Sequence, residues 1–544
     1  MLVAKRWQQR LGVIGLRVRT RRWVAVALAA AALGAATACS TGDAVSGAKP
    51  TELRLAIGGE AEDGYDPTLG WGRYGNPLFQ STLLTRDADL KITNDLATGY
   101  SVSPDGLVWT VDIRSDATFS DGKPVTPGDV AYTFNTAATS GGLTDVTVLD
   151  QAVAVDEDTV ELRLREPRST FVNRLVSLGI VPEHAHGPGY ARDPVGSGPF
   201  VLEQWDEGQQ LIVRRNDDYY GGKPAFERVV FVFTDEDASL AAARSGQVDV
   251  AALPSALAST EMPGMTLHAI ESVDNRGITF PYQPATGRTN ADGEPIGDPV
   301  TSDVAVRRAI NLAIDRQALV DGVLDGHGRP ATGPVDGLPW YDPSTAVTGT
   351  DPDAAARLLD EAGWRDTDGD GVRERDGVRA EFTLLYLASD SLRQGLALAV
   401  ADMLKPIGVA VTAKGESWEV IETRMHADAV LFGWGSHDPT EMYNLYHSGQ
   451  AGIELYNPGY YGDPEVDAAL DAGMAATDPA EATAHWKEAQ RHFGPAADAA
   501  WAWLVNLDHT YFVDSCLDVG QEQVEPHGHG WPITWNITGW RWTC

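Results

Sequence analysis

Strand and helix patterns alternate along the chain from residue 51 onward. Apolar and polar residues alternate at 51–57 and 108–113, which predicts strands, and the unbroken apolar run at 229–233 predicts a buried strand. Further strands are predicted as pairs at 153–164 and 201–214 and singly at 382–387, 406–412 and 429–434, and helices at 127–139, 236–244, 302–324, 353–362, 394–404, 464–475 and 479–493. Such alternation is typical of α/β lobes.

The clearest helical period lies in residues 302–324. Its apolar residues share one face that can pack on a sheet: Val306, Ala309, Ile310, Ala313 and Ile314. Asp315 is a suitable N-cap for a second helix in this segment, and Asp478 followed by Pro479 is a suitable start for the helix at 479–493.

The chain is too long for one hydrophobic core. At roughly 150 residues per domain, its 544 residues predict several domains. Its 43% hydrophobic and 22% charged residues are ordinary for a folded protein, and no repeat of a solenoid or propeller is visible. We therefore expect two α/β lobes, with a ligand bound in the crevice between them.

The first forty residues have the pattern of an export signal. A basic segment at 17–22 precedes sixteen uncharged residues, which are too few to span a membrane but suit a signal peptide. Ala36-Thr37-Ala38-Cys39 resembles a bacterial lipobox, in which the cysteine is lipidated and becomes the mature N-terminus. Residues 39–50 are small and polar, as a flexible tether requires. Cleavage after Ala38 without lipidation and export by a twin-arginine signal at Arg21-Arg22 are alternatives.

The net charge argues against nucleic acid as a partner. It is −35 for the whole chain, and removing the seven basic residues of the leader leaves −42. Such a charge would repel the phosphates of nucleic acid. It would also keep an extracellular protein monomeric, because copies of the chain repel one another.

Three cysteines occur in the chain. Once Cys39 is lipidated, Cys516 and Cys544 are the two that remain, and export would allow them to form a disulfide. Two free thiols are the alternative.

Four segments occur in a fixed order along nearly the whole chain after residue 50. They are 96–134 (LATGYSVSPDGLVWTVDIRSDATFSDGKPVTPGDVAYTF), 195–220 (VGSGPFVLEQWDEGQQLIVRRNDDYY), 304–323 (VAVRRAINLAIDRQALVDGV) and 353–364 (DAAARLLDEAGW), the last followed later by Pro464-Glu465-Val466-Asp467. Together they resemble the peptide/nickel type of ABC-transporter solute-binding proteins, family 5 of the extracellular solute-binding proteins.

The resemblance implies a two-lobed flytrap fold of the periplasmic-binding-protein type, with an extra subdomain in the first lobe. The implied division is a signal peptide at 1–38, a lipid-anchored linker at 39–50, the extra subdomain at 87–194 and the second lobe at 276–504. The core of the first lobe would combine residues 51–86, 195–275 and 505–544, so both ends of the mature chain return to it.

The resemblance also implies binding without chemistry or a cofactor. The lobes would close on a short peptide and deliver it to the permease and ATPase of an ABC importer, at the outer face of the cell membrane. A nickel or other metal chelate is the alternative ligand, and a peptide-signal receptor without transport is the alternative function. An exported hydrolase is disfavoured, since the sequence has no GxSxG nucleophile motif and no recognised metal motif.

The most informative segment for the ligand is 432–447 (FGWGSHDPTEMYNLYH). In the resembled family this segment faces the cleft, and many peptide binders carry an aspartate just before the Asp-Pro step that pairs with the peptide's amine. Here Gly435-Ser436-His437 precedes Asp438-Pro439, which makes Asp438 the candidate substitute. Trp434, His437 and Tyr443 are further candidate ligand contacts.

The same segment keeps the metal-chelate alternative open. Trp434-Gly435 resembles the dipeptide of nickel-chelate binders, and His437 and His447 are the candidate metal contacts. A surface or supporting role is the alternative for both histidines.

The first lobe and the hinge contribute their own candidates. Trp71, Arg73 and Tyr74 follow the first strand and are expected at the mouth of the cleft, and Tyr282 is expected near the hinge. Arg73 can pair with a ligand carboxylate, and the aromatic rings can stack on ligand side chains.

Two other segments imitate metal sites. His527 and His529 offer imidazoles that suit nickel, copper or zinc, although packing of their loop against nearby tryptophans explains them as well. Residues 366–377 (DTDGDGVRERDG) imitate a calcium loop but end in Gly377 instead of the bidentate glutamate, which favours a solvated turn.

Overall fold

This computed structural model describes residues 51–61, 63–75, 78–347 and 349–544. A single mixed sheet connects most of this part of the chain. Its strands are β1 (Glu52–Ala56), β8 (Phe200–Asp206), β9 (Gln210–Arg215), β10 (Arg228–Val232), β11 (Val250–Ala252), β12 (Met265–Thr279), β13 (Gly328–Pro330), β16 (Glu381–Leu387), β17 (Ala410–Glu416), β18 (Ala429–Trp434) and β19 (Trp501–Asp514). They follow the order β17-β16-β18-β12-β19-β11-β1-β10-β9-β8, and β13 pairs with β19. The predicted signal peptide, Cys39 and the linker at 39–50 lie outside the described residues.

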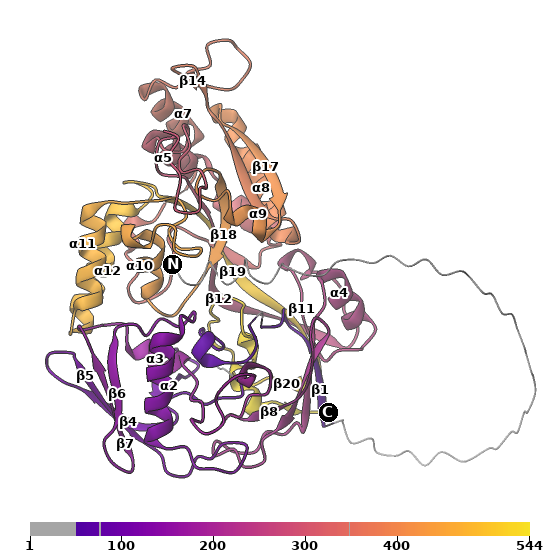
Figure 1. The fold of residues 1–544 in the computed structure, drawn as a ribbon. Helices are drawn as coiled ribbons and strands as arrows, with labels where there is room; N and C mark the ends of the chain where they lie inside the picture. The colour runs from indigo at the N-terminus through magenta and orange to yellow at the C-terminus, as the bar shows by residue number, and fades with distance from the viewer. Residues whose placement is uncertain (1–50, 62, 76–77, 348) are drawn as a thin grey trace, which may run out of the picture. The chain divides into compact units, whose positions relative to one another are not determined.

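Two long strands, β12 and β19, hold this sheet together. They pair antiparallel from Met265 and Asp514 at one end to Thr279 and Trp501 at the other (Figure 1). β11 pairs with the Asp514 end of β19, and β18 pairs with the Thr279 end of β12. We call the side with β11, β1, β10, β9 and β8 lobe I, and the side with β18, β16 and β17 lobe II.

Lobe II has a hydrophobic core on each face of its strands. Along β18, Ala429 and Leu431 point into one core, whereas Val430 and Phe432 point into the other, as the period of two in a strand requires. The helices of lobe II are α5 (Val304–Ala313), α6 (Arg316–Val323), α7 (Pro352–Glu361), α8 (Ser391–Leu404), α9 (Trp418–Glu422), α10 (Thr440–Tyr446), α11 (Pro464–Ala475) and α12 (Pro479–Phe493).

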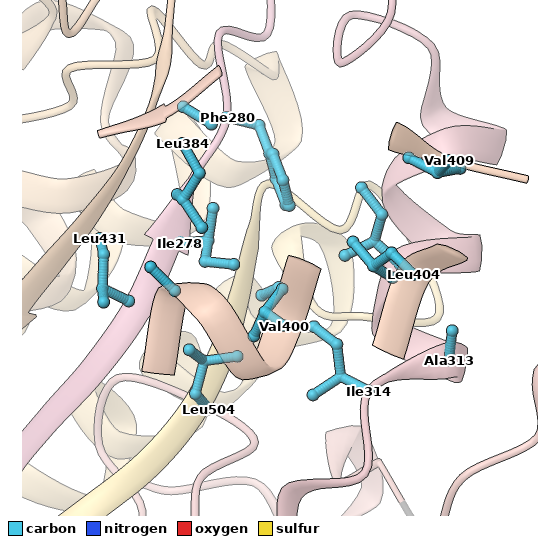
Figure 2. Close-up of a cluster of buried hydrophobic side chains, with 14 of the residues drawn as sticks. Ile278, Phe280, Ala313, Ile314, Leu384, Val400, Leu404, Val409, Leu431 and Leu504 are labelled. Carbon is cyan, nitrogen blue, oxygen red and sulfur yellow. The ribbon is translucent and has the colours of Figure 1, made fainter. Parts of the chain in front are cut away.

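Figure 2 shows the first of these cores, where Val400 and Leu404 of α8 lie among side chains from several strands and helices. The apolar face predicted in residues 302–324 is confirmed, because its five members are all buried in this core: Val306, Ala309, Ile310, Ala313 and Ile314.

Lobe I is built around aromatic packing. Trp531 stacks on Phe231 with ring centroids 4.1 Å apart, and Tyr65 and Trp71 make edge contacts in the same cluster. α4 (Glu236–Arg244) lies against β11, and the hairpin of β2 (Leu84–Arg86) and β3 (Ile92–Asn94) leads toward the small sheet.

A separate four-stranded sheet follows that hairpin in the chain. It has the order β4-β5-β7-β6 and consists of β4 (Ala97–Val102), β5 (Val108–Ile113), β6 (Leu149–Ala154) and β7 (Thr159–Leu164). α2 (Pro127–Ser140) and α3 (Val172–Ser177) share a core with it that contains Phe119, Phe134 and Phe171. The predicted residue boundaries of the lobes and of the extra subdomain remain predictions.

Aspartates begin many of the helices, which accounts for part of the acidic composition. Asp315 accepts the Ala318 N–H at 2.9 Å and Asp478 accepts the Ala480 N–H at 2.9 Å, so both predicted N-caps are confirmed. α2 has a reciprocal capping box between Thr126 and Asp129. None of the helices in the described ranges combines the length and the apolar composition that crossing a membrane requires.

Two predicted strand segments differ from the structure, and two long strands were missed. The strand predicted at 406–412 begins only at Ala410, because Lys405–Ile407 continue α8 as a tight 3₁₀ turn. The pair predicted at 153–164 begins earlier, at Leu149. The long strands β12 and β19 were not predicted at all, because they cross from one environment to another and carry no uniform alternation.

The C-terminal segment is closed by a disulfide between Cys516 and Cys544, in agreement with the sequence prediction. The bridge flanks the pairing of β20 (Leu517–Asp518) with β21 (Arg541–Trp542). The remaining short hairpin consists of β14 (Glu374–Arg375) and β15 (Val378–Arg379).

We expect the double variant Cys516→Ser/Cys544→Ser to lose about 3 kcal/mol of unfolding free energy, because the bridge closes a loop with a sequence separation of 28. Urea unfolding of both proteins measures this difference. Peptide mapping without reductant should recover the two cysteines in one linked peptide, and recovery of two free thiols would contradict the bridge.

Candidate ligand-binding site between the lobes

The loop that follows β18 lies where the two lobes meet. β18 ends at Trp434, whose backbone pairs with Asn275 of β12, and the chain then passes through residues 435–439 into α10. Gly435 lies so close to β12 that a Cβ there would come within 2.5 Å of the Val273 carbonyl oxygen. A glycine is therefore required for the loop to cross the strand.

This loop makes three polar contacts with residues outside lobe II. The Asp438 carboxylate pairs with the Arg174 guanidinium of α3 at 2.8 Å. Arg86 of β2 donates to the His437 carbonyl at 3.0 Å, and the His527 N–H donates to the Gly435 carbonyl at 2.8 Å. The loop is thus a contact surface between the lobes.

Three buried polar atoms near this loop have no hydrogen-bond partner among the described residues. They are Trp434 Nε1, His437 Nε2 and Glu441 Oε1. Unpaired buried polar atoms cost stability, so their presence together in one short segment points to a binding site for a polar group.

Burial keeps the two ionisable side chains with unpartnered atoms, His437 and Glu441, neutral at pH 7. Burial, assisted by the nearby charge of Arg86, lowers the pKa of His437 to about 3. Burial also raises the pKa of Glu441 to about 8, although the Gly435 N–H donates to its other oxygen at 3.0 Å.

A buried polar cluster lies beside the loop, on the hinge strands. The Asp274 carboxylate of β12 accepts hydrogen bonds from Arg276 at 2.5 Å, His527 at 2.6 Å and His509 at 3.1 Å. Burial alone lowers the pKa of His509, but its bonds to Asp274 and Glu525 raise that pKa to about 9. The cluster connects β12, β19 and the C-terminal segment.

The structure brings four of the predicted ligand contacts close to the meeting of the lobes. Tyr74 of lobe I lies against His529, with ring centroids 6.2 Å apart, and Arg73 lies over the Tyr74 ring at 5.0 Å. Burial raises the pKa of Tyr456 to about 12, and Arg73 and Tyr74 are among the groups close enough to influence it. Tyr456 in turn contacts Trp434 at 5.8 Å. His437, which follows Trp434 closely in the chain, is the fourth of these predicted contacts.

The other predicted contacts lie elsewhere or are already engaged. Trp71 is buried in the aromatic cluster of lobe I. Tyr282 packs on Tyr461 and under Arg307 in lobe II. The Asp438 carboxylate pairs with Arg174 and accepts a hydrogen bond from the Thr440 N–H.

Tyr443 stacks on His447, with ring centroids 4.3 Å apart, and His447 lies 3.4 Å from Asp471. Within the described ranges, the groups of three potential metal ligands are Asp463, Glu465 and His492, and Asp366, Asp368 and Asp370. Neither group contains His437 or His447. Asp370 of the calcium-like loop is paired with Arg379 at 2.8 Å.

Sequence analysis did not identify Glu441, Asp274 or Arg276 as candidate site residues. Glu441 resembles an ordinary acid in the first turn of a helix. The spacing of Asp274 and Arg276 was an available signal, because two charged residues at i and i+2 share one face of a strand. It was missed because β12 itself was not predicted.

Two α/β lobes that share paired crossing strands and enclose buried, unpartnered polar groups define a protein that binds a small solute. Residues 91–454 match the family model described as bacterial extracellular solute-binding proteins, family 5 Middle. The chain is 39% identical over 531 residues to Protein XP55 of Streptomyces lividans, covering 93% of this chain and 94% of that protein. It is 27% identical to the oligopeptide-binding protein AppA of Bacillus subtilis, over 74% of this chain and 76% of that one.

The chain therefore belongs to family 5 of the bacterial extracellular solute-binding proteins. Its two-lobed fold is shared with NikZ from Campylobacter jejuni, solved with Ni(L-His), at a TM-score of 0.80 and 22% identity, covering 91% of this chain and 100% of that one. It is also shared with Bacillus subtilis AppA, solved with a nonapeptide, at a TM-score of 0.73 and 24% identity, covering 91% and 99%. The predicted family and fold class are thereby confirmed.

We expect the ion pair between Arg174 and Asp438 to couple α3 to the loop after β18. A double-mutant cycle with Arg174→Ala and Asp438→Asn should give a coupling energy of about 1–3 kcal/mol in urea unfolding, because both side chains are mostly buried. The same cycle at the more exposed pair of Arg163 and Glu161 should give less than about 0.5 kcal/mol. Equal coupling at both pairs would contradict a special role for Arg174.

We also expect Glu441 to make the ligand-free protein less stable as the pH rises. Between the ordinary carboxyl pKa of 4.5 and about 8, the unfolded chain has lost the Glu441 proton while the folded chain keeps it. This contribution is fully present below pH 4.5 and is lost as the pH rises toward 8, with a slope of at most about 1.4 kcal/mol per pH unit.

Glu441→Gln, which cannot titrate, should therefore gain stability relative to the native protein as the pH rises from 5 to 8. Urea unfolding at four pH values in this range measures the trend, and Glu419→Gln, at an exposed position in the same lobe, is the control. A constant difference between the native protein and Glu441→Gln across the range would show that Glu441 has an ordinary pKa in the folded chain.

Proposed function

We propose that this chain captures a short peptide between its lobes and delivers it to the permease and ATPase of an ABC importer, without chemical change to the peptide. The observation that carries the proposal is the group of unpartnered buried atoms on Trp434, His437 and Glu441. Tyr74 and Arg73 of lobe I lie close enough to this segment to interact with Glu441 and Tyr456. Aromatic rings beside single polar groups suit a ligand that alternates apolar side chains with amides.

The ligand class is supported by relatives, one of which carries the name oligopeptide-binding protein. A peptide supplies both donors and acceptors along its backbone. Trp434 Nε1 requires an acceptor, and His437 Nε2 and Glu441 Oε1 can each serve a donor or, with the proton on that atom, an acceptor. We keep Arg73, Tyr74, Trp434 and His437 as the proposed peptide contacts.

The proposed mechanism is closure about the two crossing strands. Regular pairing of β12 with β19 is interrupted between Glu271 and Asn275 and again between Arg276 and Gly277, and such irregularities let a strand bend locally. A ligand that contacts both lobes stabilises the closed arrangement in proportion to its preference for that state. The ion pair between Arg174 and Asp438 would stabilise the closed arrangement whether or not ligand is bound.

The location of the protein is part of the proposal. We propose that residues 1–38 are a signal peptide, that Cys39 is lipidated, and that residues 39–50 tether a monomer to the outer face of the membrane. The proposed lobes are 51–86 with 195–275 and 505–544 for lobe I, 87–194 for its extra subdomain, and 276–504 for lobe II.

Native mass spectrometry of protein purified without refolding tests the ligand class. We expect a bound peptide of a few residues, and calorimetry with that peptide should give binding that weakens about tenfold or more in Trp434→Ala and Tyr74→Ala, because each ring loses its contact area. Tyr100→Ala, at an exposed ring on β4, is the control that should leave binding unchanged. A retained nickel or metal chelate in place of peptide would overturn the proposal.

A further inference from the structure

Two parts of the chain that are distant in sequence meet at the end of α11. The Ser169 N–H donates to the Met474 carbonyl at 2.8 Å, and the Ser169 hydroxyl donates to the Gly473 carbonyl at 2.7 Å. Both carbonyls lie in the last turn of α11, where a helix cannot satisfy its own carbonyl groups. A residue outside lobe II therefore caps this helix.

The end of α11 is fixed by packing within lobe II. Gly473 lies so close to α12 that an added Cβ would come within 2.9 Å of the Trp486 ring. Met474 belongs to the same hydrophobic core as Trp486. Because the two carbonyls are held by this core, any movement of lobe II away from Ser169 has to break both hydrogen bonds.

The same segment also reaches the loop after β18. Residues 166–174, which we call the arm, lead into α3. Arg174 of the arm pairs with Asp438 of that loop at 2.8 Å. Asn173 accepts a hydrogen bond from Arg86 at 2.6 Å, and Arg86 in turn donates to the backbone of the loop at 3.0 Å. One segment outside lobe II thus contacts both a helix end and the loop that carries candidate ligand contacts.

The contact between the arm and lobe II is polar and incompletely packed. Among the described residues, the core around Phe119, Phe134 and Phe171 has no member from lobe II. A small cavity remains between the two sides, and its lining includes Val148, Arg168, Thr170, Phe171, Thr440 and Met474. Arg168 Nε is buried without a hydrogen-bond partner in the described part of the chain. Domains that share no hydrophobic core can separate without either of them unfolding.

These contacts favour the joined arrangement by a modest amount. When the arm separates from α11, water can hydrogen-bond to the two freed carbonyls, so each bond to Ser169 adds little net stability. Interactions of this size suit an equilibrium between joined and separated arrangements, because a small difference in free energy leaves both populated.

We infer that the arm is a latch: by capping α11 and holding the loop after β18, it keeps the lobes closed on a captured ligand and slows the release of that ligand. The inference rests on the proposed function, because it assumes that the lobes close on a ligand. Since Ser169 binds the end of α11, it controls how long a ligand stays and not which ligand is chosen.

The rate at which bound peptide leaves tests the latch. The full chain is loaded with an equimolar library of tripeptides to pentapeptides and diluted, and native mass spectrometry follows the loss of bound peptide over time. We expect Ser169→Ala to speed release about three- to tenfold, because the hydrogen bond to the Gly473 carbonyl is lost. The association rate should stay unchanged, since mutations in one interface act mostly on dissociation.

Matched variants separate the latch from a general loss of stability. Ser169→Thr keeps the hydroxyl and should restore slow release. Adding Arg174→Gln to Ser169→Ala should speed release further, because the ion pair with Asp438 is also lost. Ser101→Ala, at an exposed position on β4, is the control that should release peptide at the native rate. Thermal unfolding checks that each variant folds.

Equal release rates in the native protein, in Ser169→Ala and in the double variant with Arg174→Gln would overturn the latch while leaving peptide capture intact. If the native protein binds no member of the library, the proposed ligand class is overturned, and small-angle scattering of the ligand-free chains then decides the latch. A larger radius of gyration in the double variant than in the native protein would support the latch, and equal radii would overturn it.

Discussion

The antiparallel pairing of β12 with β19 is the interaction on which the rest of the structure depends. Lobe I extends from one end of this pair and lobe II from the other, so the two strands are the shared element of both cores. The register of the pairing is disturbed near Asn275, where the strands leave one lobe and enter the other. Such an irregularity lets a strand bend locally, because ladder hydrogen bonds are missing there.

The candidate site lies beside the irregular part of the β12–β19 pairing for a physical reason. Asp274 and Arg276 sit at the irregular part of β12, and β18 ends opposite Asn275, so its loop enters the region between the lobes. Buried polar atoms without partners lie here on Trp434, His437 and Glu441, and they cost stability in the ligand-free protein. Large hydrophobic cores in both lobes offset that cost.

Charge is distributed on two scales in this molecule. Aspartates at helix starts and on the surface give the chain its large negative charge, which acts over long distances. Two buried arginines lie close together near Gly433, where low polarity strengthens each short contact.

The sequence by itself determined the family, the α/β class, the main helices with caps such as Asp315 and Asp478, and the cysteine pair. These follow from local signals: periodicity, capping residues and spacing along the chain. Only the tertiary structure decided that Asp438 is engaged by Arg174, that Trp71 packs in a core, and that Arg276 and Arg393 meet over Gly433. Such contacts join residues that are distant in the chain, and their burial and unfilled hydrogen bonds exist only once both lobes are folded.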